Sequence, residues 1–232
     1  LKATRPKPAA GFQSMIDFAA ARHLMVESQV RAHDVTDVRL QTAMRTTPRE
    51  LFAPKALQQV AYMERDIDLG DGRTLLSART FAKLLQAADV QPGDIALDIG
   101  CGAGYSSAIL AALCETVVAL EDSADFSAAT NQRLGQLGID NVAVVEGPLE
   151  AGKADQGPFD VIFINGGVGA APSALFEQLS AGGRLAAIVM QGPVGKATIF
   201  RKGKDGAVGR TVAFDATAPI LPGFEPAKTF SL

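Results

Sequence analysis

The sequence predicts a doubly wound α/β fold, in which helices cover a mostly parallel, seven-stranded sheet. After Pro92-Gly93 the chain alternates between strand-like and helix-like runs. The strand-like runs are apolar almost throughout, as expected for strands that are buried on both faces of a parallel sheet. Residues 196–214 then contain two strand-like runs around a glycine-rich turn, which predicts an antiparallel hairpin at one edge of the sheet.

Residues 15–90 are expected to form an N-terminal helical cap with a substrate loop. Apolar residues recur there at helical spacing, and Pro48 is expected to stop the second helical segment. A glycine turn and a polar loop follow, and they lead into an amphipathic helix that contains Phe81 and Leu85. The apolar positions of the cap are Leu24, Met25, Val30, Val38, Leu40 and Met44.

Residues 91–232 are expected to form the α/β domain, in one compact unit with the cap. The runs that resemble strands are rich in β-branched or aliphatic residues. They are 94–99, 116–121, 141–147, 159–165 and 184–190, with helical stretches at 105–114, 125–138 and 171–183. Residues 1–14 are basic and proline-rich, and we interpret them as a leader or an added remnant, with Met15 as the native start.

Composition excludes several classes of protein. The 22 basic and 25 acidic residues give a net charge of -3, which argues against a nucleic-acid partner. No apolar run approaches the roughly 18 residues needed to cross a membrane. Cys101 and Cys114 form no CxxC pair, so we expect neither a disulfide framework nor a metal site. A cytoplasmic location fits best, and the sequence does not indicate an oligomeric state.

The stretch LDIGCGAG (97–104) is the turn from the first strand of the domain into its first helix. In such folds ligands bind beyond the carboxyl ends of the strands, and this turn is the usual contact. Gly100, Gly102 and Gly104 remove side chains where a ligand must approach the backbone. The helix that begins near Tyr105 directs its free N–H groups at the ligand.

Two ligands compete for this turn. A dinucleotide carries a pyrophosphate and prefers a G-x-G-x-x-G motif without an acid beside it. Here the spacing is G-x-G-x-G, and Asp98 lies immediately upstream. S-adenosylmethionine has an ammonium, a sulfonium and no phosphate, so it fits this charge pattern better. We expect Asp98 to face the ammonium and Glu121, at the end of the second strand, to accept hydrogen bonds from the ribose. The predicted cofactor-binding residues are Asp98, Gly100, Cys101, Gly102, Gly104, Tyr105 and Glu121. A nicotinamide oxidoreductase and a tight turn without a ligand remain as alternatives.

The chain also resembles the protein-L-isoaspartate (D-aspartate) O-methyltransferases from about Met25 to its end. DIGCGAGY (98–105) is similar to the EIGTGSGY of the family, but this motif occurs in many methyltransferases. The N-terminal segments are more specific. TPRELFAP (47–54) resembles the family's PREXFVP segment, and AYMERDIDLGDGRT (61–74) resembles AYXDXPLPIGXGQT.

This resemblance implies methyl transfer from S-adenosylmethionine to isoaspartyl carboxylates of damaged proteins or peptides. A carboxylate is already ionised at neutral pH, so no general base is needed. Catalysis would depend mainly on holding a carboxylate oxygen in line with the sulfonium methyl group. The missing Ser-His-Asp or metal constellation is therefore expected.

Three positions depart from the family pattern. The family's T-x-S-x-P loop places a serine in contact with the substrate, but an ungapped alignment from Thr74 puts Leu76 at that serine. One inserted residue would give the role to Ser77, which is otherwise the N-cap of the following helix. Thr74 and Ser77 are therefore the candidate catalytic residues.

The other two departures affect the adenine and the acceptor. Pro148 stands where the family's G-D-G motif has an aspartate that contacts the adenine. Asn165 stands where the family has small residues, and it is either a substrate contact or part of an Asn-Gly turn. Two further alternatives therefore stay open: a methyltransferase with another acceptor, and a degenerate cofactor-binding protein without repair activity.

Overall fold

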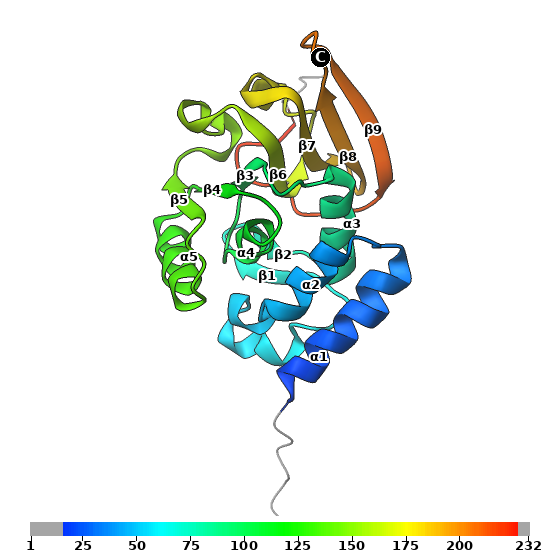
Figure 1. Cartoon of the computed structure of the whole chain (residues 1–232), viewed down its shortest axis with the longest axis vertical. Coiled ribbons are helices and arrows are strands. Elements are labelled where there is room, and N and C mark those ends of the chain that lie inside the picture. Colours follow the sequence, from blue (N-terminus) through cyan, green and yellow to red (C-terminus); the bar gives the residue numbers. More distant parts are fainter. Residues whose placement is uncertain (1–15, 227–232) are drawn as a thin grey trace, which may run out of the picture.

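A seven-stranded sheet forms the centre of residues 16–226, the part of the chain that the computed structural model describes (Figure 1). Neighbouring strands pair in parallel from β5 to β7, and β8 and β9 continue the sheet as an antiparallel hairpin. This arrangement confirms the predicted fold class and its antiparallel edge. The expected leader, 1–14, lies outside the described residues. In sheet order the strands are β5 (Val142–Glu146), β4 (Thr116–Glu121), β3 (Ile95–Ile99), β6 (Phe159–Val168), β7 (Leu179–Gln191), β8 (Val194–Lys202) and β9 (Val208–Asp215).

Alternate residues of the parallel strands contribute to two separate hydrophobic cores, because successive side chains point to opposite faces of a sheet. On one face, Phe163 belongs to a core shared with helices α3 (Ala78–Ala88) and α4 (Tyr105–Ala111). On the other face, Leu97 shares a core with Leu221, from the segment that follows β9. The segment that follows β9 therefore completes the second core.

The strand order reverses at β3. β4 lies on one side of β3 and β6 lies on the other, so the carboxyl ends of these strands border the topological switch point where ligands bind in such folds. Helix α5 (Ala124–Gln136) connects β4 to β5 and packs against both strands. The predicted strands in this region are confirmed to within a few residues at each end.

The N-terminal part is helical, as its apolar spacing predicts. Figure 1 shows these helices in blue at one end of the molecule. Asp17 and Asp37 cap the two α-helices through side-chain oxygens that accept backbone N–H groups. No helix of the described residues is long and apolar enough to span a bilayer. The helical segments are α1 (Phe18–Met25), a π-helical turn (Val26–Val30), α2 (Val38–Thr46) and 3-10 helices at Arg31–His33, Arg49–Phe52 and Lys55–Val60.

The loop expected before α3 contains a β-hairpin. Its strands are β1 (Ile67–Gly70) and β2 (Arg73–Leu75), which pair antiparallel. Asp71 and Gly72 at the turn have φ values of 50° and 72°. Positive φ at both central residues is the requirement of the tight hairpin turn that Asp-Gly favours. The sequence predicts a glycine turn and a polar loop here, but not the two short strands beside the turn.

A second prediction was wrong at 171–183, where a helix was expected. The segment forms only a 3-10 helix (Ser173–Gln178), and β7 begins directly after it. The segment contains good helix formers such as Ala174, Leu175 and Glu177, so tertiary pairing with the sheet overrides the local helix propensity. Leu179 instead pairs with Phe159 at the start of β6.

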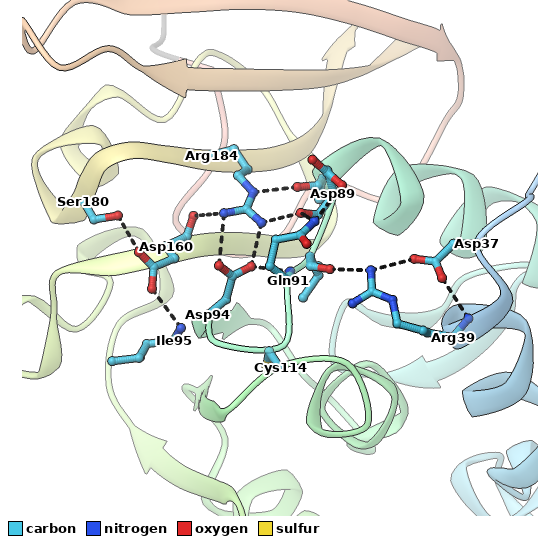
Figure 2. A network of polar contacts seen from close by, with 12 residues as sticks. Asp37, Arg39, Asp89, Gln91, Asp94, Ile95, Cys114, Asp160, Ser180 and Arg184 are labelled. Atoms are coloured by element: carbon cyan, nitrogen blue, oxygen red, sulfur yellow. Dashed lines mark hydrogen bonds and ion pairs between the residues drawn. The ribbon is translucent and has the colours of Figure 1, made fainter.

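Arg184 joins the amino ends of the central strands (Figure 2). Its guanidinium forms an ion pair with Asp94, with an Nη2–Oδ2 distance of 2.6 Å. It also donates to the main-chain oxygens of Ala88 and Asp89 at the end of α3. Since these groups are buried, each charge depends on its partners for compensation.

We predict that Arg184→Ala lowers the free energy of unfolding by about 3–5 kcal/mol, because it leaves Asp94 buried without its cation. Urea denaturation followed by circular dichroism measures this change. The matched control is Arg201→Ala, which alters an exposed arginine on β8 and should change the free energy by less than about 0.5 kcal/mol. Equal effects of the two changes would contradict the role of Arg184.

Candidate active site

The turn after β3 has the conformation that its glycines predict. Gly100 and Gly104 have φ values of 70° and 91°, in the region that residues with a Cβ rarely adopt. Gly104 is also the N-cap of α4. Cys101 is buried in the same turn, and burial raises the pKa of its thiol well above the usual value. At its glycines the turn therefore has no side chains, and the turn is covered by other parts of the protein.

Asp98 lies on β3 and is fully buried. Its Oδ2 accepts hydrogen bonds from the hydroxyls of Ser106 (2.7 Å) and Ser107 (2.6 Å) on α4. Its Oδ1 is buried and has no hydrogen-bond partner among the described residues. Burial raises the pKa of Asp98 to about 6, with a smaller contribution from the charge of Glu121. A carboxylate with one open acceptor suits a cationic group of a ligand.

Glu121 ends β4 and is fully buried. One carboxylate oxygen accepts the N–H of Gly102 at 2.8 Å, and the other accepts the N–H of Asp122 at 2.9 Å. Burial alone would raise the pKa of this carboxyl, but the hydrogen bonds and charge of Arg73 outweigh it and lower the pKa. Glu121 thus links the glycine turn to β4, as its predicted place beside the turn requires.

Arg73, on β2, is a residue of this site that the sequence did not reveal. Its Nε lies 3.0 Å and 3.1 Å from the two oxygens of Glu121, and its Nη2 lies 2.6 Å from one of them. Arg73 also pairs with Asp122 and is only 2% exposed. One sequence signal could have drawn attention to it: the AYXDXPLPIGXGQT segment of the family has glutamine where this chain has Arg73.

The residue types of the turn suit the predicted methyl donor, but side chains of the protein lie beside the turn in this conformation. The acceptors of Glu121 that would bind a ribose already bind Arg73. A Cβ at Gly102 would lie 3.4 Å from the Cβ of Arg73, and a Cβ at Gly100 would lie 2.8 Å from Leu221. The space over the turn is therefore filled by side chains of the protein.

The candidate acceptor residues lie at three different places. Ser77 caps α3, accepts the N–H of Thr80 at 3.4 Å, and lines a cavity of about 550 Å³. Thr74 lies in β2 and lines a separate cavity, of about 490 Å³. Asn165 lies within β6 and donates to the main-chain oxygen of Gly100 at 3.3 Å. Asn165 therefore contacts the glycine turn directly, and Asp66 borders both cavities.

In this conformation Tyr105 packs inside the protein, and Pro148 lies at the start of a short helix. The Tyr105 ring packs against Phe52 and Phe81, and the guanidinium of Arg49 lies 5.0 Å from its centroid. Pro148 precedes the short 3-10 helix Leu149–Ala151. Tyr105 therefore connects α4 to the N-terminal part of the chain.

Comparison with known proteins shows which family this chain is similar to. The family model of protein-L-isoaspartate(D-aspartate) O-methyltransferase (PCMT) matches residues 20–216. The protein-L-isoaspartate O-methyltransferase of Koribacter versatilis is 35% identical over 214 residues, which cover 91% of this chain and 96% of that protein. The protein of the same name from Methylorubrum extorquens is 35% identical over 210 residues, 89% of this chain and 91% of the relative.

Solved structures share the fold. A protein-L-isoaspartate O-methyltransferase aligns with a TM-score of 0.75 and 24% identity over 88% of this chain and 67% of its own. A Plasmodium falciparum structure of this kind, in complex with S-adenosyl-L-homocysteine, aligns with a TM-score of 0.74 and 19% identity over 86% of this chain and 97% of its own. On the family match and the curated relatives, the chain belongs to the protein-L-isoaspartate(D-aspartate) O-methyltransferase family.

Proposed function

We propose that the protein transfers a methyl group from S-adenosylmethionine to the carboxylate of isoaspartyl residues in damaged proteins or peptides. Membership of the family supports this reaction. The structural observation that carries it is Asp98, a buried carboxylate with an open acceptor beside a glycine turn. When bound, the cofactor supplies an electrophilic methyl group. The acceptor carboxylate is ionised at neutral pH, so the protein needs no general base.

The proposed roles of the cofactor residues follow their positions. Asp98 would accept the ammonium of the methionine moiety through Oδ1, since that oxygen has no other described partner. Gly100, Gly102 and Gly104 would lie under the cofactor, with Cys101 in the same turn. Tyr105 would contribute as the first residue of α4. Glu121 would bind the ribose once Arg73 leaves its carboxylate.

The acceptor side is proposed to include Thr74, Ser77 and Asn165. The cavity beside Ser77 is lined by both acidic and basic side chains, including Asp66, Arg79 and Lys196. Such mixed charge suits a peptide backbone with a carboxylate and neighbouring polar side chains. The partners are accordingly proteins or peptides. A cytoplasmic location is supported by Cys101 and Cys114, which are both free and buried.

The function is tested with a pair of peptides that differ only in an isoaspartyl or a normal aspartyl residue. We predict methyl transfer from labelled S-adenosylmethionine to the isoaspartyl peptide at a rate at least about tenfold higher than to its partner. Equal rates would indicate another acceptor. Cofactor binding without transfer to either peptide would indicate a binding protein.

We predict that Asp98→Asn stabilises the free protein but weakens cofactor binding. The folded pKa of about 6 is above the unfolded value of 3.8, so the wild type loses stability as the pH rises through 6. At pH 7.5 the variant should unfold with a free energy higher by on the order of 2 kcal/mol, and the difference should shrink toward pH 4. Urea denaturation at both pH values measures it.

Calorimetric titration with S-adenosyl-L-homocysteine provides the second half of this test. Loss of the carboxylate should weaken binding at least about tenfold, because a charge-assisted hydrogen bond is removed. The control is Asp140→Asn, which changes an exposed aspartate away from the turn. A destabilised Asp98→Asn variant that binds as tightly as the wild type would contradict both roles of Asp98.

Ser77 is predicted to combine a structural and an acceptor role. Ser77→Ala should lower the free energy of unfolding by about 1 kcal/mol through loss of the N-cap. It should also reduce kcat/KM for the isoaspartyl peptide roughly tenfold. Ser77→Asn restores a capping side chain, so it should recover stability but not kcat/KM. Recovery of both would show that capping is the whole role of Ser77.

A further inference from the structure

The chain after β9 is bound to the carboxyl end of β6. We define residues 218–224 as the C-terminal strap. The N–H of Gly167 donates to the oxygen of Pro219 at 2.7 Å, and the N–H of Leu221 donates back to Gly167 at 2.9 Å. Gly167 and Ile220 form a parallel bridge. The strap is therefore held by main-chain hydrogen bonds, as a short added strand is.

Glycines at the end of β6 make this docking possible. A Cβ at Gly166 would lie 2.7 Å from the Cγ of Leu221, and a Cβ at Gly167 would lie 2.7 Å from the oxygen of Ala218. Any larger residue at these two positions would displace the strap.

The side chain of Leu221 fills the space over the cofactor turn. It is 1% exposed and lies against Gly100 as well as Gly166. Gly100 is the first glycine of the turn, where the cofactor is expected to approach the backbone. A nucleoside and this leucine side chain cannot occupy the same space.

Arg73 closes the other part of the crevice from a different element. It takes the Glu121 oxygens that a ribose would need, and its stem lies over Gly102. The strap also lies close to the β1–β2 hairpin, since a Cβ added at Gly72 would lie 3.6 Å from Pro222. Two elements that are distant in sequence thus meet over one binding site.

We propose that the strap and Arg73 form a self-occupied resting state of the cofactor site, which the methyl donor must displace in order to bind. This inference rests on the proposed function. It predicts that the observed affinity for the cofactor is the affinity of the open form reduced by the fraction of molecules that are open. A substitution that weakens the contact of the strap or of Arg73 should therefore tighten cofactor binding, although it removes an interaction of the free protein.

The test is calorimetric titration of the full chain with S-adenosyl-L-homocysteine. Leu221→Ala and Arg73→Gln should each bind it at least about tenfold more tightly than the wild type, and the double variant more tightly still. The matched controls are Leu113→Ala, a buried leucine near the end of α4, and Arg31→Gln, an exposed arginine paired with Glu27. The controls should bind within about twofold of the wild type.

Hydrogen exchange on the wild type gives a readout that needs no variant. The amides of Gly167 and Leu221 should be protected in the free protein and should exchange faster when S-adenosyl-L-homocysteine is saturating. Equal affinities across all variants, or strap amides that stay protected in the bound state, would overturn the inference and leave the proposed function standing. Absence of binding even in the double variant would overturn the inference and the proposed cofactor together.

Discussion

The carboxylate of Glu121 is the group on which the arrangement of the site depends. It ends the strand next to the central one, receives the N–H of Gly102 and forms a buried ion pair with Arg73. Three elements are therefore fixed by one side chain: β4, the glycine turn and the β1–β2 hairpin. A buried carboxylate without such partners would be strongly unfavourable, so the position of the hairpin follows from the need to compensate Glu121.

The same requirement connects binding to folding in this family member. A ribose could compensate Glu121 through its hydroxyls, and Arg73 does so in its absence. Asp98 differs, because its second oxygen has no partner among the described residues and its pKa is raised to about 6. The carboxylate of Glu121 is thus satisfied by the protein itself, whereas Asp98 keeps one oxygen without a partner among the described residues.

The sequence predicted the sheet well because its information is local. Apolar runs such as 116–121 and 159–165 indicate buried strands without knowledge of their neighbours, and the alternating glycines of 100–104 indicate a strand–turn–helix. A glycine turn was expected near Asp71-Gly72, but the strands beside it were not, because they are only 4 and 3 residues long. The helix expected at 171–183 is only a short 3-10 helix, because the chain from Leu179 onward pairs with β6 instead of continuing as a helix.

The closed crevice could not be predicted in this way. Arg73 follows a glycine turn and reads as a surface residue, and its burial depends on a carboxylate 48 positions later. Leu221 belongs to a segment without helical or strand periodicity, and its place depends on the absence of side chains at Gly100 and Gly166. Both features are long-range, and each is visible only when two distant segments are placed together.

The second hydrophobic core gives the strap a consequence for the rest of the molecule. Leu221 and Phe224 belong to that core, together with Leu97 and Ile99 of the central strand. A strap that has moved away from β6 would expose these aliphatic and aromatic side chains to water, and such a face is prone to self-association. Bound methyl donor, or the damaged polypeptide that accepts the methyl group, would then cover the apolar surface that the strap has left.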